Sequence, residues 1–246
     1  FTTISVGLVL AGAAQAQIFI SANDGKQLRP GEGPETRTPD TLSIIDIKSA
    51  PKILATIETP ATLLGPPSSA AVAPDGGFAV VTSAQKLDAG AVPPTLVVDD
   101  VLTVIDLASP SAPKIVQTLH PGPGAGALSI RRDGKLALVA IGNEDTVAVY
   151  AIKDKRLTLV EKIAFEAGSK PTDVLIARDG RSALVTLQGV NKVARLNING
   201  MKVTRGGPDI GVGLAATALA YDRTGAFAYN ANQQGRTLPD GAAAPP

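Results

Sequence analysis

The segment "IRRDGKLALVAIGNEDTVAVYAI" at residues 130–152 contains two apolar runs separated by a polar hinge. An Asp-Gly pair precedes the first run, and Asn-Glu-Asp separates the two runs. The same order of turn, apolar run, hinge and apolar run returns in "IARDGRSALVTLQGVNKVARLNI" at residues 176–198. Because Asp-Gly pairs are typical of tight hairpin turns, the repetition indicates a recurring unit of antiparallel strands.

This turn-and-strand signature occurs four times, and its spacing defines the size of the unit. The segments are 71–81, 129–139, 175–185 and 220–229, with turn glycines Gly76, Gly134, Gly180 and Gly225 at intervals of 58, 46 and 45 residues. A period near 45 accommodates four short strands with their turns, the size of one β-propeller blade. The longer first interval contains "SAQKLDAGAVPPTLVVDD" at 83–100, which we interpret as an insertion in one loop.

Strands can be placed within one unit, and they predict the fold class. In the third unit the expected strands are 128–131, 136–141, 146–152 and 157–165, with a hinge at 142–145. Apolar and polar residues alternate only partly, as expected for strands covered on both faces. Outside the N-terminal segment no stretch shows a convincing helical period. The sequence therefore predicts an all-β fold, a β-propeller of four-stranded antiparallel blades.

Several repeats resemble a known family. The segments "ALVAIGNEDTVAVYAI", "SALVTLQGVNKVARLNI" and "TLSIIDI" are similar to the YVTN-type repeat of lactonase-like and surface-layer-related β-propellers, and "VLTVIDLASPSAPKIVQTL" at 101–119 is the best match. The resemblance covers nearly all of residues 17–232. It implies a propeller, commonly of seven blades. It leaves function open, because that family includes enzymes, electron-transfer subunits and binding scaffolds.

About four to five blades can be counted in this sequence. Residues 18–24, 42–47 and 53–58 are expected to be the second, third and fourth strands of a first blade, three whole blades follow, and 218–221 and 226–230 begin a fifth. We therefore expect an incomplete propeller over 17–232 and a Pro/Ala-rich loop or truncated tail over 233–246. Unpaired strand edges would make an isolated 17–246 fragment prone to aggregate. The alternative is a four-bladed ring in which 218–221 completes the first blade.

Composition excludes several classes of function. Hydrophobic residues make up 44% of the 246 residues and aromatic residues 3%, so the core must consist of Val, Ile, Leu and Ala. The formal net charge of +1 gives no reason to expect nucleic acid as a partner. The absence of Cys excludes disulfides, thiolate metal sites and covalent c-type haem attachment. A single His cannot form a multi-His centre, so we expect no metal and no cofactor.

The N-terminus predicts export. An apolar stretch at 4–10 leads into small residues that end in Ala14-Gln15-Ala16, which matches the apolar region and cleavage site of a secretory signal peptide. The apolar run is shorter than the roughly 20 residues that span a bilayer. We therefore expect a partial signal peptide over 1–16, cleavage after Ala16, no membrane span afterwards, and a periplasmic or secreted protein.

Loop lengths predict which face of the propeller binds a ligand. The connections between second and third strands are long at 24–40, 83–100 and 233–241 and short in the third and fourth units. With strands running alternately up and down, these connections share a face with the linkers between blades, and the Asp-Gly turns lie opposite. Ordering long loops costs entropy, which favours a use on that face, at the mouth of the central channel.

Seven polar residues are expected to line the channel mouth: Asn23, His120, Asn143, Glu144, Lys170, Asp173 and Gln188. His120 stands in a linker between blades and is either a general base or a solvated loop residue. Asp173 lies beside an innermost strand, from which a side chain can reach the channel. The aspartates of the Asp-Gly turns are expected to be structural.

Three functions remain open from the sequence. The first, which we favour, is a periplasmic binding or scaffold protein with a protein partner or small-molecule ligand at the channel mouth. The second is a lactonase-like sugar-acid hydrolase that uses the same channel mouth. The third is a non-redox subunit of a periplasmic dehydrogenase, with the redox centre on a partner.

Overall fold

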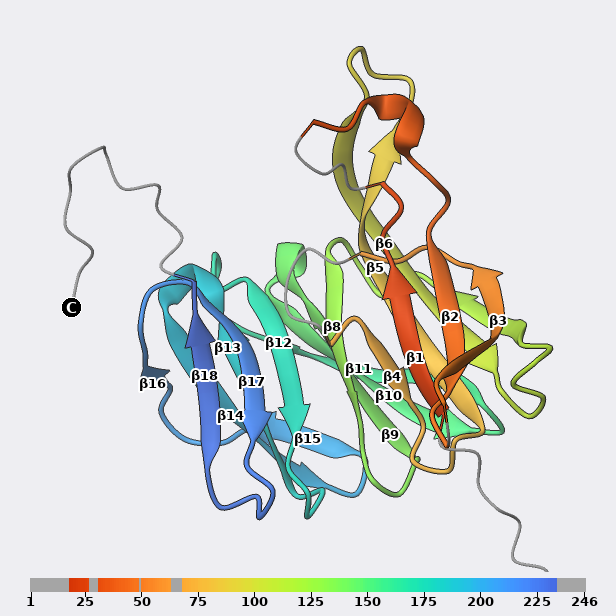
Figure 1. The fold of residues 1–246 in the computed structure, drawn as a ribbon. Helices are drawn as coiled ribbons and strands as arrows, with labels where there is room; N and C mark the ends of the chain where they lie inside the picture. The colour runs from red at the N-terminus through yellow and green to blue at the C-terminus, as the bar shows by residue number, and fades with distance from the viewer. Residues whose placement is uncertain (1–17, 27–30, 49, 63–67, 234–246) are drawn as a thin grey trace, which may run out of the picture.

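The computed structural model describes residues 18–26, 31–48, 50–62 and 68–233. Its strands form five antiparallel sheets that follow one another in chain order, as the blades of a β-propeller (Figure 1). The described residues contain no α-helix, only three 3₁₀ turns: η1 (Pro34–Thr36), η2 (Gly142–Glu144) and η3 (Gln188–Val190). The predicted all-β propeller fold is confirmed.

The blades have the following strands. Blade one consists of β1 (Ile18–Asn23), β2 (Thr41–Asp46) and β3 (Lys52–Glu58). Blade two consists of β4 (Ala70–Val72), β5 (Phe78–Asp88), β6 (Thr95–Asp106) and β7 (Lys114–Leu119). Blade three consists of β8 (Ala125–Ile130), β9 (Leu136–Ile141), β10 (Thr146–Lys153) and β11 (Arg156–Ala164). Blade four consists of β12 (Pro171–Ile176), β13 (Ser182–Leu187), β14 (Lys192–Asn199), β15 (Lys202–Arg205) and β16 (Ile210–Gly211). Blade five consists of β17 (Ala216–Tyr221) and β18 (Ala228–Asn232).

The four repeated turns have one geometry. In blade three the amide of Gly134 donates to the carbonyl of Arg131, and the amide of Arg131 donates to the carbonyl of Leu136. The same pair of bonds closes the turns around Gly76, Gly180 and Gly225. All four glycines have φ between +68° and +78°, a left-handed conformation that side chains disfavour. The repeated glycine in the sequence is thus explained by the turn.

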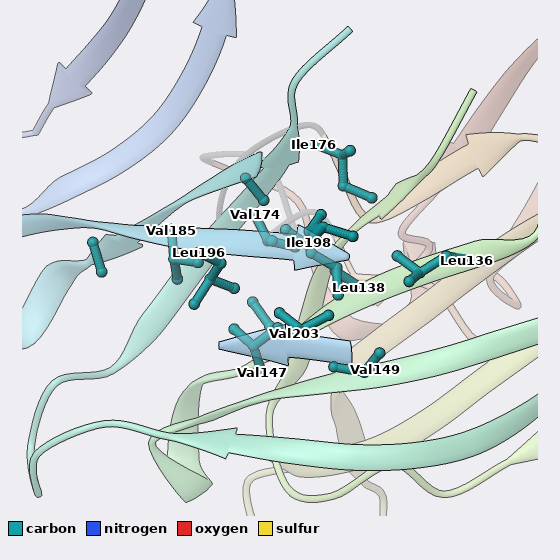
Figure 2. Packing of buried hydrophobic residues seen from close by; sticks show 14 of the residues in the cluster. Leu136, Leu138, Val147, Val149, Val174, Ile176, Val185, Leu196, Ile198 and Val203 are labelled. Carbon is teal, nitrogen blue, oxygen red and sulfur yellow. The ribbon is translucent and has the colours of Figure 1, made fainter. Parts of the chain in front are cut away.

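The core lies between blades, because successive residues of a strand point to opposite faces. In β9, Leu136 and Leu138 pack toward blade four, whereas Val139 and Ile141 pack toward blade two. All six residues of β9 are buried, which accounts for the weak alternation in the sequence. Figure 2 shows the cluster between blades three and four. Its labelled side chains are Leu136, Leu138, Val147, Val149, Val174, Ile176, Val185, Leu196, Ile198 and Val203.

The segment 83–100, predicted to be an inserted loop, is instead mostly an extended β-hairpin. Strands β5 and β6 contain 11 and 12 residues, against six in β8 and β9. Beyond a register shift after Ser83, their pairing continues from Gln85↔Val98 to Asp88↔Thr95. Figure 1 shows this hairpin projecting from blade two. The loop prediction was wrong because three of the four residues at 95–98, Thr95, Val97 and Val98, are β-branched and favour strand.

The fourth strand of blade four also differs from the other blades. It is divided into β15 and the short β16, both of which pair with β14. In blade five, β17 pairs with β18, whereas β1 of blade one pairs with β2 and not with β17. The ring in which 218–221 completes the first blade is therefore not formed.

Some predictions fall outside the described residues. The signal peptide at 1–16 and residues 234–246 of the tail are among them, so both stay predictions. Within the described ranges, no helix has the length and apolar character needed to cross a membrane.

Candidate functional site

A pocket opens on the face that carries the linkers between blades and the hinges between second and third strands. Its volume is about 420 Å³, which is within the usual range for small-molecule sites. We call it the channel-mouth pocket. Its polar side chains are Thr62, Ser69, Thr82, Gln85, Asn143, Lys170, Thr172, Gln188 and Gln233, and Gly124–Ala127 contribute backbone. The hinge residues Asn143 and Gln188 and the linker residues Gly124 and Lys170 all line it, so the pocket lies on the predicted face.

Lys170 is held at the rim of the pocket by an acidic side chain from the preceding blade. Its backbone has φ of +46°, which is uncommon for a residue with a side chain. The carboxylate of Asp145 accepts hydrogen bonds from the amides of Lys170 (2.7 Å) and Gly168 (2.8 Å). In the described part of the chain the Lys170 ammonium makes no ion pair, so its charge remains available to a ligand.

The next blade repeats this arrangement with Asn191. Its side-chain oxygen accepts a hydrogen bond of 2.8 Å from the amide of Ala215, whose φ is +55°. Asp145 and Asn191 themselves have φ of +54° and +56°, and they are 46 residues apart, one repeat. Sequence reasoning missed both as positioning residues. The signal was present, because Asp or Asn recurs at the repeat position that directly follows η2 and η3.

Neutral hydrogen-bonding groups accompany Lys170 around the pocket. Asn143 lies in η2 and is exposed, and Gln188 lies in η3, where its amide is 3.4 Å from the hydroxyl of Thr217. The side-chain oxygen of Gln85 is buried and finds no hydrogen-bond partner among the residues that the structure describes. An unpaired buried acceptor is costly, so a ligand hydroxyl that donated to Gln85 would stabilise the complex.

Asp173 is buried beside the channel rather than presented at its mouth. Asp173 is 3% exposed. One carboxylate oxygen accepts hydrogen bonds from the Ser68 hydroxyl (2.7 Å) and the Val174 amide (2.8 Å), and the other accepts from the Leu219 amide (2.7 Å). Burial raises the pKa of Asp173, although these three donors act to lower it. The residue ties blade four to blades two and five.

The other predicted site residues also have partners within the protein. The imidazole of His120 is 2.9 Å from Asp100 and is largely exposed. Glu144 forms an ion pair with Lys162 at 2.7 Å. Asn23 donates to the hydroxyls of Thr41 (3.0 Å) and Ser43 (3.2 Å) in blade one. The structure therefore brings together Asn143, Lys170 and Gln188 in the lining, and leaves Asn23, His120, Glu144 and Asp173 outside it.

The chemistry of the lining suits recognition of a polar ligand. Among the described lining residues Lys170 is the only charged side chain, and there is no carboxylate or imidazole. No group of three His, Asp or Glu in the described ranges is arranged to hold a metal ion.

Comparison with known proteins relates this chain to others by fold. No protein-family model and no curated protein matches the sequence. A solved structure of a functionally unknown protein from Desulfotomaculum acetoxidans matches with a TM-score of 0.63 and 18% identity, over 78% of this chain and 56% of that one. A proposed 6-phosphogluconolactonase from Bacteroides uniformis matches with a TM-score of 0.62 and 13% identity, over 78% and 57%.

A third neighbour is an enzyme of a different class. Dihydro-heme d1 dehydrogenase NirN matches with a TM-score of 0.62 and 19% identity, over 89% of this chain and 40% of that one. This chain has a lactonase-like β-propeller fold. It spans just over half the length of the first solved structures that it matches. At these identities the likeness concerns the fold, and the YVTN-type repeat stays a prediction.

Proposed function

We propose that this protein binds a small, hydroxyl-rich carboxylic acid, such as a sugar acid, in the channel-mouth pocket. The observation that carries the proposal is the composition of the lining: one cation, Lys170, among neutral hydroxyl and amide groups. An ammonium group forms charge-assisted hydrogen bonds with a carboxylate. Side-chain amides and hydroxyls can donate hydrogen bonds to the several hydroxyl groups of such a ligand and accept hydrogen bonds from them.

Binding is favoured over hydrolysis because of how the nearby acidic groups are engaged. Asp173 holds three hydrogen bonds and is buried, and Glu144 is paired with Lys162. A general base must lie within hydrogen-bond reach of the water that it activates. In the described lining no side chain supplies that base, so the simplest use of the pocket is recognition.

Titration calorimetry with D-gluconate and with D-glucose tests this proposal. Gluconate is expected to bind more tightly than glucose, because only gluconate carries a charge for Lys170. Lys170→Ala should weaken gluconate binding roughly tenfold, the effect of losing one charge-assisted hydrogen bond. The matched control is Lys153→Ala, which removes an exposed lysine from the far end of β10 and should leave binding unchanged.

Two results would contradict the binding proposal. Equal affinity of the wild type and Lys170→Ala for gluconate would remove the role of the cation. Opening of D-glucono-1,5-lactone faster than its spontaneous rate would replace it with the second candidate, a lactonase-like hydrolase. That candidate is favoured by the fold shared with the proposed 6-phosphogluconolactonase of Bacteroides uniformis. The remaining candidate is a non-redox subunit of a periplasmic dehydrogenase. It is supported by the fold shared with NirN.

The proposed location is outside the cytoplasm, in the periplasm or secreted. The proposal rests on the signal-like segment at residues 1–16. N-terminal sequencing of the exported protein is expected to begin at Gln17. A protein recovered with residues 1–16 intact would contradict it.

A further inference from the structure

The face opposite the channel-mouth pocket carries a second cavity, which is rich in arginine. Its volume is about 580 Å³, and it is lined by the Asp-Gly turns of blades three and four and by the turn after β14. Its charged residues are Arg131, Arg132, Asp133, Arg178, Asp179 and Arg181. We call it the arginine cavity. Four guanidinium groups and two carboxylates give it a formal charge of +2, against +1 for the whole chain.

Internal contacts neutralise only a part of this charge. Arg131 binds Asp133 through two contacts, of 2.9 Å and 2.8 Å, and donates to the carbonyl of Gly200 at 2.6 Å. Asp179 accepts a hydrogen bond of 2.9 Å from the backbone amide of Arg181. Within the described ranges, by contrast, no acidic side chain forms an ion pair with the guanidinium groups of Arg132, Arg178 or Arg181, and all three residues are exposed.

Two of the turn glycines lie against the aliphatic parts of Arg131 and Arg178. A Cβ added to Gly180 would lie 2.9 Å from the Cδ of Arg131, and one added to Gly225 would lie 3.3 Å from the Cδ of Arg178. Gly180 and Gly225 therefore each leave room for the aliphatic part of an arginine from the preceding blade.

The turn itself does not require these charges. The equivalent turn of blade two, Pro74-Asp75-Gly76-Gly77, has the same hydrogen bonds and contains no basic residue. Arginine stands two residues before the turn glycine in blades three to five, as Arg132, Arg178 and Arg223, and only the first two line the arginine cavity. Guanidinium groups bind phosphate and carboxylate groups through two parallel hydrogen bonds, which ammonium groups do not match.

We propose that the arginine cavity binds a small multivalent oxyanion, a phosphorylated or polycarboxylated compound. The cavity volume is within the range of small-molecule sites. The unpaired guanidinium groups of Arg132, Arg178 and Arg181 would contact the anionic groups. Asn199, which also lines the cavity, adds a neutral donor and acceptor. This site is separate from the channel-mouth pocket and does not depend on the function proposed for that pocket.

Titration calorimetry at low ionic strength, with inorganic pyrophosphate and with tricarballylate, tests the proposal and separates phosphate from carboxylate recognition. The wild type is expected to show saturable binding of at least one probe. Arg178→Ala and Arg181→Ala should each weaken it roughly tenfold, the effect of losing a charge-assisted hydrogen bond. Arg178→Lys, which keeps the charge and loses the fork, should also weaken it measurably.

The matched control is Arg156→Ala, which removes an exposed arginine of β11 that lines neither cavity. It should change the affinity less than twofold. Absence of saturable binding of both probes would overturn the proposal. Equal weakening by Arg156→Ala and Arg178→Ala would also overturn it, in favour of general charge attraction. Lys170→Ala should leave pyrophosphate binding unchanged, so failure of this site and failure of the channel-mouth pocket can be distinguished.

Discussion

Among the site residues predicted from the sequence, Asp173 is the one whose side chain hydrogen-bonds to the most blades of the described structure. Its carboxylate joins Ser68 before blade two, its own strand β12, and Leu219 of blade five. Each of these donors is partly or fully buried and would be left unpaired without it. Buried donors without partners are expensive, so this carboxylate acts at the residue scale as a cross-link between inner strands.

Asp173→Asn is therefore expected to lower the free energy of unfolding by about 1–3 kcal/mol. The amide has one oxygen for three donors, and its NH₂ group would face at least one N–H or O–H donor. Urea unfolding at neutral pH measures the change. Asp75→Asn is the control, because Asp75 is an exposed turn residue whose single acceptor role an amide oxygen can retain. Equal stability of wild type and Asp173→Asn would contradict the cross-link.

The ionised carboxylate of Asp106 is expected to make the free energy of unfolding depend on pH in acid. The ammonium of Lys155, 2.6 Å away, and the Ala108 amide lower the pKa of Asp106 below 3.8. The stabilisation from this ionised carboxylate is present above pH 3.8 and is lost as pH falls through the lower pKa of the folded state. Asp106→Asn should be less stable than wild type at neutral pH, and the difference should shrink in acid. Urea unfolding over a pH series measures it, and a pH-independent difference would contradict it.

The residues that sequence reasoning found and missed differ in how they act. Asn143, Lys170 and Gln188 were recognisable from strand order alone, since that order determines which loops share a face. Asp173 was found as a polar residue at an inner strand, but its burial depends on contacts with residues 105 positions earlier and 46 positions later. Asp145 acts on the backbone of residues 168–170, where each of its carboxylate oxygens accepts one amide hydrogen bond, and its own backbone is in the left-handed region.

At the scale of elements, regular blades were predictable and departures from regularity were not. Strand β9 is formed by residues 136–141, as expected, because a turn glycine and a polar hinge bound the apolar run. The division of the fourth strand of blade four into β15 and β16 was missed, since a short glycine-containing segment carries little periodic signal. The β5–β6 hairpin was missed because the Gly and Pro residues at its tip are typical of loops, and the whole of 83–100 was therefore predicted to be a loop.

The outer part of this hairpin is expected to be dispensable for folding. Leu96 and Val97 are 37% and 36% exposed, and Val92 at the tip is 98% exposed. Replacing residues 86–97 by Asn-Gly joins Gln85 to Val98, which already pair, through a favoured two-residue turn. The free energy of unfolding should change by less than about 1 kcal/mol. Thermal unfolding measures it, and loss of a cooperative transition would show that the hairpin supports the blade.

At the scale of the whole molecule, stability comes from contacts between blades. The three apolar clusters lie between blades one and two, two and three, and three and four. Each blade thus buries its faces only against its neighbours, as in other repeat architectures. Blade three contains the fully buried strand β9, whereas β18 exposes Tyr229 at 62%. Protection from hydrogen exchange is expected to be highest in β9 and β10 and lowest in β18.

Leu138→Ala tests whether the blades unfold as one unit. Leu138 is fully buried between blades three and four (Figure 2), and its truncation should lower the free energy of unfolding by about 2–5 kcal/mol. Leu159→Ala in β11 is the control, because Leu159 is 48% exposed and should cost less than about 1 kcal/mol. If neighbouring blades support one another, Leu138→Ala should shift a single urea transition monitored by circular dichroism. Two separate transitions in this variant would show instead that the blades on either side of the cavity unfold independently.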